Sequence, residues 1–306
     1  MIDRVETANS FIREGDFEKA RKIYSGLLDQ DPENVTNISG FFISSYWDNR
    51  LELILKTREG LERGRKLVHL FEEFDREIAK RAFPKNVSYQ NATQCILGEA
   101  SQHFRLSYQK EGTMGLDLVV LSELALCLVR TGDYKNAEDV LAYAASLQKT
   151  PDQVFLRAEA LYFLGKEDLS RKLFTEGFLM DPSLLRLEIV HSEPLASAIK
   201  TLQKSIEAES DLKEFLPVYC LEKKLLPVLP RTEKEIFALF AETNRLYENL
   251  QKDSAYFFKL TCRILQFSLH ILENTTEQSE IYQKTERILT ATDPEFLSRY
   301  RLSGSG

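Results

Sequence analysis

Apolar residues recur every three or four positions through most of this chain, and two stretches repeat the same order of residues. One stretch, GDFEKARKIYSGLLDQDP, begins at Gly15, and the other, GDYKNAEDVLAYAA, begins at Gly132. In both, an alanine and then a large apolar residue follow the glycine at the same offsets. The apolar spacing predicts amphipathic helices, and the recurrence of one pattern predicts an architecture of repeated helical hairpins.

Three segments align on this pattern, namely residues 1–34, 118–150 and 151–184. In each segment a small residue on the first helix faces a small residue on the second, which permits a close approach of the two helices. A glycine lies in the turn between them, where a residue without Cβ adopts the left-handed conformation at little cost. A large residue then fills the space toward the next hairpin. The marked positions are Ala8, Gly15, Ala20 and Tyr24 in the first segment, Ala125, Gly132, Ala137 and Leu141 in the second, and Ala158, Gly165, Ser170 and Phe174 in the third.

This pattern resembles the tetratricopeptide repeat in the three segments. The resemblance implies an all-α protein whose hairpins stack into a right-handed α-solenoid, because each hairpin needs a neighbour to bury its apolar face. Two features depart from the repeat. The usual aromatic residue near the start of each unit is absent, and Gly177 stands where a small alanine is typical. Repeats of this kind specify a fold, and they leave the partner open.

The repeat region is expected to cover residues 1–183, with divergent helices over residues 37–115. After Pro182 the pattern stops, and the apolar spacing predicts a C-terminal helical region without repeats over residues 184–302. Residues 303–306 read SGSG and are expected to form a flexible tail.

Three local signals organise the C-terminal region. The prolines of FLPVYCLEKKLLPVLPR predict a broken helix followed by a loop. Thr232 and Glu235 have the spacing of a capping box, which predicts the start of a further helix. Asp253 is expected to cap the next helix, SAYFFKLTCRILQFSLHIL, whose apolar residues on most sides predict deep burial.

The resemblance also implies a concave groove lined by the first helix of each hairpin. In the two adjacent segments the positions that face this groove are mostly apolar and aromatic. Such a surface suits a peptide with hydrophobic anchors, although the same side chains are buried if the C-terminal helices pack into the groove. The predicted groove residues are Val119, Ser122, Leu126, Val129 and Arg130 in the second segment, and Asp152, Phe155, Glu159, Tyr162 and Phe163 in the third.

Composition narrows the class of protein. The formal net charge of −7 disfavours a nucleic-acid partner, because no basic stripe is available to displace counterions from phosphates. The four cysteines are scattered singly, which suggests neither a zinc site nor a disulfide framework. No apolar run reaches about 18 residues, so we expect no membrane span. The N-terminal MIDRVETANSF enters a helix at once and no signal peptide is visible, so we expect a cytoplasmic protein.

Catalytic chemistry finds little support in the sequence. No motif for a catalytic, phosphate-binding or metal-binding site is present, so we expect no catalytic residues, no metal and no cofactor. His191 is the only histidine in an expected loop, beside Ser192 and Glu193. Neighbours in sequence do not by themselves form a catalytic triad, whose members are set by geometry in space.

These observations favour a non-enzymatic interaction or scaffold protein that binds a peptide segment in the concave groove. The alternative is a small-molecule-responsive regulator or an enzyme, with a pocket between the solenoid and the C-terminal helices lined by His191, Glu193, Tyr219 or Cys220. A third hypothesis is a homo-oligomeric scaffold, in which the groove of one copy receives the C-terminal helices of another.

Overall fold

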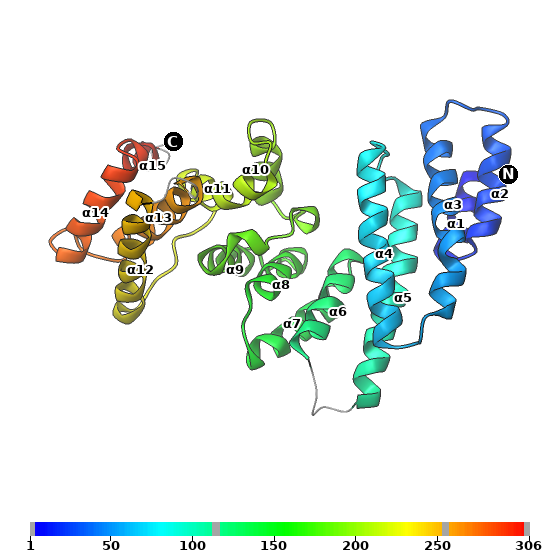
Figure 1. Ribbon diagram of the computed structural model, residues 1–306, viewed down its shortest axis with the longest axis horizontal. Helices are drawn as coiled ribbons and strands as arrows, with labels where there is room; N and C mark the ends of the chain where they lie inside the picture. The colour runs from blue at the N-terminus through cyan, green and yellow to red at the C-terminus, as the bar shows by residue number, and fades with distance from the viewer. Residues whose placement is uncertain (1–3, 112–116, 253–256, 303–306) are drawn as a thin grey trace. The chain divides into compact units, whose positions relative to one another are not determined.

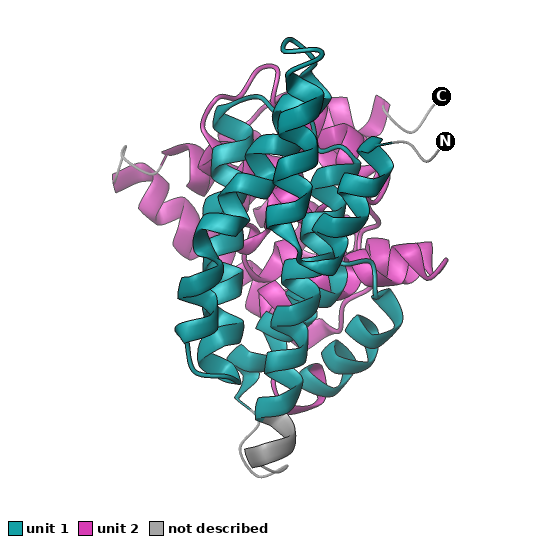
Figure 2. Cartoon of the chain, turned by 90° about the vertical axis from the view of Figure 1, so that its right-hand side faces the viewer, with its two compact units in different colours: residues 1–144 teal, residues 145–306 magenta. Residues whose placement is uncertain are grey.

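The computed structural model describes residues 4–111, 117–252 and 257–302. Throughout these ranges all regular structure is helical (Figure 1), as the sequence predicts. Over the same residues, no helix combines the length and the apolar character needed to cross a membrane. The chain forms two compact units, unit 1 over residues 1–144 and unit 2 over residues 145–306 (Figure 2). The stacking of the hairpins into a solenoid stays a prediction.

Unit 1 is a set of antiparallel helices in which α5 has a central place. Helix α5 packs against α1, α4 and α6, while α2 packs against both α1 and α3. The helices are α1 (Arg4–Glu14), α2 (Phe17–Leu28), α3 (Val35–Lys56), α4 (Leu61–Lys80), α5 (Val87–Glu111) and α6 (Leu118–Arg130), followed by α7 (Tyr134–Leu147), most of which belongs to this unit.

Aromatic side chains form the core between α3, α4 and α5. Trp47 of α3 is fully buried, and its ring centroid lies 5.3 Å from that of Phe74 and 6.1 Å from that of Phe71. Tyr89 of α5 stacks on Phe74 at 5.8 Å. Offset and tilted ring pairs of this kind add about 0.5–1.5 kcal/mol each beyond the area that they bury, so this cluster anchors the three divergent helices.

A buried polar network ties α1 and α2 to α5. The hydroxyls of Tyr24 and Ser88 both donate to Asn9 Oδ1, at 2.9 and 2.8 Å. Tyr24 reaches this network across α3, because Gly40 has no side chain there and a Cβ at that position would overlap the Tyr24 ring. The large residue that the repeat pattern places at position 24 therefore joins elements that lie far apart in the sequence.

The three predicted hairpin turns share one backbone geometry. Gly15, Gly132 and Gly165 have φ values of +82°, +76° and +75°, which confirms the predicted left-handed glycines. In each turn the glycine N–H donates to the carbonyl three residues earlier, and the next N–H donates to the carbonyl five residues before it. The small residues predicted to let the helices approach are all buried, namely Ala8, Ala20, Ala125, Ala137, Ala158 and Ser170.

Unit 2 begins with a helical hairpin and continues with helices of unequal length. Helix α13 packs against α11, α12 and α14, and α8 packs against α9. The elements are α8 (Pro151–Phe163), α9 (Glu167–Met180), the 3₁₀ turns η2 (Pro182–Leu184) and η3 (Leu187–Ile189), α10 (Leu195–Leu202), α11 (Glu209–Glu222), α12 (Glu233–Lys252), α13 (Phe257–Leu272), α14 (Glu280–Thr292) and α15 (Phe296–Leu302).

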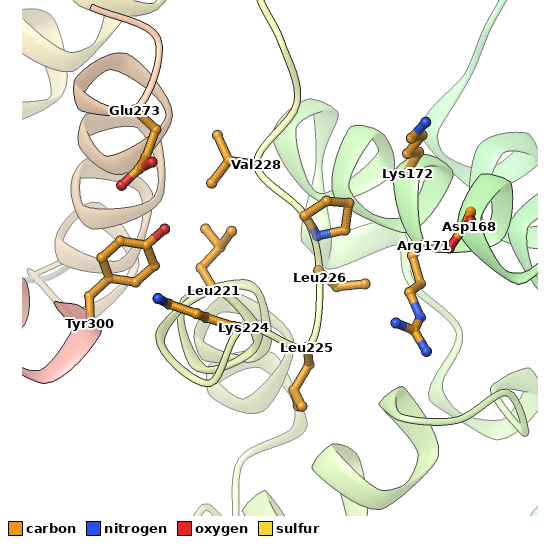
Figure 3. Close-up of a pocket in the computed structure, with 11 residues that line it drawn as sticks. Asp168, Arg171, Lys172, Leu221, Lys224, Leu225, Leu226, Val228, Glu273 and Tyr300 are labelled. Atoms are coloured by element: carbon orange, nitrogen blue, oxygen red, sulfur yellow. The ribbon is translucent and has the colours of Figure 1, made fainter. Parts of the chain in front are cut away.

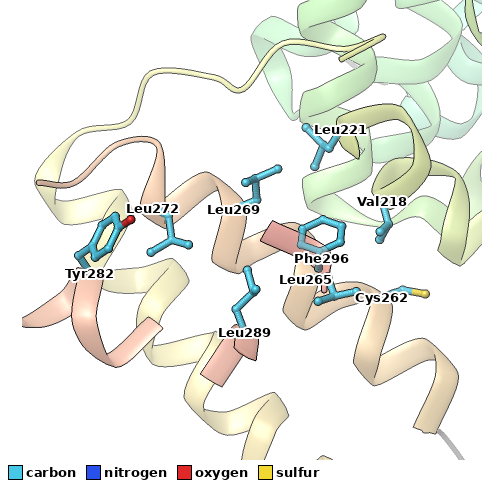
Figure 4. Close-up of a cluster of buried hydrophobic side chains, with 9 residues drawn as sticks. All are labelled: Val218, Leu221, Cys262, Leu265, Leu269, Leu272, Tyr282, Leu289 and Phe296. Atoms are coloured by element: carbon cyan, nitrogen blue, oxygen red, sulfur yellow. The ribbon is translucent and has the colours of Figure 1, made fainter. Parts of the chain in front are cut away.

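The core of unit 2 surrounds α13, whose residues from Ile264 to Leu272 are all buried. This burial confirms the predicted deep burial for the C-terminal part of the helix. At its start the prediction is wrong, because Phe257 and Phe258 are 56 % and 41 % exposed. One cluster joins α11, α13, α14 and α15 (Figure 4), and it consists of Val218, Leu221, Cys262, Leu265, Leu269, Leu272, Tyr282, Leu289 and Phe296.

The prediction of a helix broken at Pro217 is wrong. Helix α11 passes through this proline and ends only at Glu222. A proline inside a helix costs about 3 kcal/mol, but Leu216 and Val218 beside it are buried, and each such aliphatic side chain stabilises the fold by about 1.5–3 kcal/mol. Burial therefore outweighs the lost hydrogen bond.

The other local predictions for this region have mixed outcomes. The loop after α11 is confirmed, and so is the capping box, because the Thr232 N–H and Oγ1 both donate to Glu235 Oε2, at 2.8 and 2.7 Å. The proposed cap at Asp253 and the tail over residues 303–306 lie outside the described residues.

Candidate functional site

The predicted groove residues of unit 1 lie along α6 and differ widely in exposure. Val119 is 54 % exposed and Ser122 is half-buried, whereas Leu126 and Val129 are buried in the unit. The surface that α6 offers to a ligand therefore comes from its first two turns.

Arg130, the fifth predicted groove residue on α6, is engaged in packing. Its guanidinium donates to Asp75 Oδ2 and, at 3.1 Å, to the Tyr89 hydroxyl, and it lies 4.7 Å above the Phe71 ring centroid. Burial, and secondarily the Asp75 carboxylate, raise the pKa of Tyr89, so its hydroxyl stays neutral. Arg130 thus contributes a buried charge network to unit 1.

The predicted groove residues of unit 2 lie on α8. Phe155 and Glu159 are each 1 % exposed, Tyr162 is half-buried and Phe163 is 41 % exposed. Asp152, also half-buried, lies 3.6 Å from the Arg186 guanidinium. A peptide groove along the first helices stays a prediction, and the accessible part of it lies at Tyr162 and Phe163 in this unit.

Glu159 fastens the loop that follows η3. Its Oε1 accepts the N–H groups of His191 and Ser192, at 2.7 and 3.1 Å. Burial raises the pKa of Glu159, and hydrogen bonds from Ser192 and His191 oppose that rise. The location of His191 in a loop is therefore confirmed, and its backbone is a partner of a buried carboxylate.

A cavity of about 520 Å³ lies in unit 2 where α9 faces α11 and the connection to α12 (Figure 3). We name it the junction cavity, and its volume falls within the range of about 300–1,000 Å³ typical of ligand sites. Residues from α9, α11, the connection, the end of α13 and α15 line it. They are Asp168, Arg171, Lys172, Leu221, Lys224, Leu225, Leu226, Pro227, Val228, Glu273 and Tyr300.

Side-chain hydrogen bonds fasten the connection between α11 and α12, which forms one wall of the junction cavity. Thr175 Oγ1 of α9 donates to the Pro227 carbonyl at 3.0 Å. Asn274, just after α13, donates to the Leu229 carbonyl at 3.0 Å and accepts the Arg231 N–H at 2.9 Å. The wall is thereby anchored on both sides.

Helices α9 and α13 are also linked directly. Arg263 of α13 donates to three carbonyls at the C-terminal end of α9, those of Phe178, Leu179 and Met180, at 2.5, 3.0 and 3.4 Å. A cation at this end satisfies carbonyls that lack helical partners and interacts favourably with the helix dipole. Arg263 therefore joins α13 to the C-terminal end of α9, the helix that carries Arg171 and Lys172.

The junction cavity contains both apolar and charged side chains. In Figure 3, Arg171, Lys172 and Asp168 come from α9, while Lys224, Tyr300 and Glu273 lie beyond the connecting segment. Leucine, proline and valine side chains line the space between these groups. Such an arrangement supplies apolar contact area together with groups that orient a charged ligand.

Lys224 has an unusual backbone conformation at the end of α11. Its φ is +52°, its N–H donates to the Leu221 carbonyl, and the N–H of Leu225 donates to the Cys220 carbonyl. This is the helix ending that glycine prefers, and a left-handed residue with a side chain costs about 1–2 kcal/mol. The Lys224 ammonium lies 5.1 Å from the Tyr300 ring centroid.

The groups that line the junction cavity suit binding better than catalysis. Burial, with the nearby Glu273 carboxylate, raises the pKa of Tyr300 to about 12, so its hydroxyl stays protonated near neutral pH. The four residues expected to line a pocket, namely His191, Glu193, Tyr219 and Cys220, are not among the lining residues. No group of metal-ligating side chains occurs within the described ranges.

The cysteines of both units have thiols that burial keeps protonated. Burial raises the pKa to about 11 for Cys95 and to about 12 for Cys127 and Cys262, and it raises that of Cys220 as well. A thiol acts as a nucleophile only as its thiolate. These four residues therefore behave as packing groups.

Little in the sequence indicates the junction cavity. Lys224 precedes a proline-rich connection that the sequence predicts to be a loop, and only the fold brings that loop beside Arg171 and Lys172 of α9. Comparison with protein-family models, with curated proteins and with solved structures finds no match to this chain.

Proposed function

We propose that this protein is a non-enzymatic interaction protein that binds a short segment of a partner protein in the junction cavity. The observation that carries the proposal is a cavity with a preformed apolar wall and charged groups around it. Peptides bind such sites by inserting an apolar anchor while polar groups at the rim fix the register.

The helical hairpins agree with this proposal. Repeats similar to those of the tetratricopeptide family expose surfaces along a stack of hairpins, and α8 with α9 has the packed small residues and the left-handed glycine of such a hairpin. The junction cavity lies on the second helix of that hairpin. The accessible side chains of the predicted groove are further candidate contact residues, Val119 and Ser122 in unit 1 and, separately, Tyr162 and Phe163 in unit 2.

A cavity-filling substitution tests the proposal. Leu225 is half-buried, lines the junction cavity and does not belong to the core cluster of Figure 4. We expect Leu225→Trp to occlude the site while the protein stays folded, as circular dichroism would verify. Leu184→Trp is the matched control, because Leu184 is an exposed leucine of the same unit away from the cavity.

Affinity capture from native cell extract, quantified by mass spectrometry, compares these variants with the intact protein. Partners retained by Leu184→Trp and lost by Leu225→Trp would support binding in the junction cavity. The same set of partners on all three proteins would refute it, and Phe163→Glu would then test the predicted groove.

A small-molecule-responsive regulator is the second candidate function. It is favoured by the same observation, since the junction cavity has the volume of a ligand site. Native mass spectrometry of the protein purified from cells distinguishes the two, because a co-purified small molecule displaced in Leu225→Trp would identify a regulator.

A further inference from the structure

The lysines of the junction cavity lack a carboxylate partner, although the Lys224 ammonium lies 5.1 Å from the Tyr300 ring centroid. Asp168 lies in the first turn of α9, where the helix dipole stabilises an acidic side chain. The Glu273 carboxylate accepts a hydrogen bond from the Tyr300 hydroxyl. Among the described residues, by contrast, no carboxylate is within ion-pair distance of Lys172 or Lys224.

Arg171 is only loosely paired. Its Nη2 lies 3.8 Å from Glu167 Oε2, and its buried Nε has no hydrogen-bond partner. A guanidinium offers several donors in a fixed plane and matches a carboxylate well. The junction cavity thus contains donors for an anion that the chain itself does not satisfy.

Lys224 stands out because it occupies a position where glycine would be more stable. Only one other described residue with a side chain, Ala82, has a positive φ, also +52°. Both follow the end of a helix with the same pattern of backbone hydrogen bonds. Strained backbone conformations cluster at functional sites, so a strained residue with a charged side chain at a cavity favours a binding role for that side chain.

We infer that the junction cavity selects an acidic segment of a partner protein, with Lys224, Lys172 and Arg171 binding its carboxylates and the wall from Leu225 to Val228 binding a neighbouring apolar side chain. The inference rests on the proposed function that this cavity is the binding site, and it adds the chemistry of the ligand. A basic segment is disfavoured, because it would bring like charges together next to a low-dielectric wall.

Three synthetic peptides test this selectivity by fluorescence anisotropy. They alternate leucine with glutamate, glutamine or lysine and are otherwise identical. We expect the glutamate peptide to bind most tightly, the lysine peptide to bind most weakly, and the affinity of the glutamate peptide to fall as salt is added. A glutamate peptide that binds no more tightly than the lysine peptide, or that shows no binding at millimolar concentration, overturns the inference.

Lys224→Gly separates binding from folding, because it removes the charge and relieves the backbone. We expect the melting temperature to rise by about 2–4 °C, while affinity for the glutamate peptide falls about three- to fivefold. Affinity for the glutamine peptide should not change. Ala82→Gly is the matched control, since it relieves the same conformation in unit 1 and should raise the melting temperature without changing peptide affinity.

The outcomes of the two experiments are distinguishable. If Lys224→Gly leaves the affinity for the glutamate peptide unchanged, the inference is wrong. If the glutamine and glutamate peptides bind equally and both are lost in Leu225→Trp, the cavity binds peptides without selecting charge, so the proposed function stands and the inference fails. The proposed function itself is refuted by a different result: in the capture experiment, Leu225→Trp would retain every partner that the intact protein captures.

Discussion

Gly177 lies inside α9 with ordinary helical geometry, so its lack of a side chain must have a cause in packing. A Cβ built there would lie 2.5 Å from Cε1 and 2.8 Å from Cδ1 of Phe155. Carbon atoms pack best at about 3.5–4.0 Å. The Phe155 ring would therefore have to move by about 1 Å to accept even a methyl group.

The Phe155 ring has little freedom to move. It is 1 % exposed, and its centroid lies 5.2 Å from that of Phe178 and 6.4 Å from that of Phe174. Overpacking of this kind costs about 1–3 kcal/mol, while replacing a helical glycine by alanine gains about 0.5–1 kcal/mol. We expect Gly177→Ala to lower the free energy of unfolding by about 1–2 kcal/mol.

Urea unfolding followed by circular dichroism measures this effect, with two comparisons. Gly26→Ala is the control, because Gly26 is helical and a Cβ there meets no atom within 4 Å; it should stabilise by about 0.5–1 kcal/mol. In a Phe155→Leu background the ring is gone, so Gly177→Ala should become neutral or stabilising. Equal destabilisation by Gly177→Ala with and without the Phe155 ring would show that the packing argument is wrong.

Three further predictions concern charge and capping. Arg130→Met should destabilise the protein by about 3 kcal/mol, because Asp75 is left as a buried charge without its main partner; the Asp75→Asn double variant should recover part of this loss in urea unfolding. Burial lowers the pKa of His270 from 6.5 to about 4, so the unfolded state binds this proton first, and stability should fall by up to about 3 kcal/mol as the pH drops from 6.5 to 4. The His270→Gln variant should show a smaller loss over that window. Thr232→Ala should lower the free energy of unfolding by about 1 kcal/mol, and Glu235→Gln should cost less, because the Thr232 hydroxyl also caps the helix.

The features that the sequence predicts correctly depend on neighbours within one or two helical turns. The glycine turns are of this kind, since a left-handed residue after a helix is specified by the glycine itself. The capping box at Thr232 is another, because both partners lie in the same turn. The burial of α13 from Ile264 to Leu272 follows from the composition of that part of the helix, with apolar residues on most of its circumference.

The exposure of the predicted groove residues could not be predicted from their positions within the repeat. Offsets within a repeat place Arg130 and Glu159 toward a ligand, but each has partners elsewhere in the chain. Asp75 lies 55 residues before Arg130, and Ser192 lies 33 residues after Glu159. A position on a helix face does not reveal whether a later segment covers it, and here the structure supplies a partner for both charges.

The prediction at Pro217 failed for a related reason. Proline is a strong local signal against a helix interior. Nothing in the neighbouring sequence shows a favourable contribution large enough to offset its cost. The opposing contribution is the burial of Leu216 and Val218 on either side of the proline, with Val218 packed in the cluster that includes α13. Tertiary packing decides the outcome wherever a helix carries enough buried aliphatic surface.

The junction cavity depends both on a local feature, the backbone conformation of Lys224, and on contacts between segments that lie far apart in the sequence. For this reason a substitution of Lys224 tests the cavity most directly. The wall formed by the connection is fixed by Thr175, which lies 52 residues before Pro227, and by Asn274, which lies 43 residues after Arg231. Because this wall is anchored on both sides, a ligand does not lose binding free energy in ordering it. Affinity then depends on the few side chains that the ligand meets. Lys224 is one of these, and its local strain makes the folded state less stable, so its replacement by glycine should move stability and binding in opposite directions.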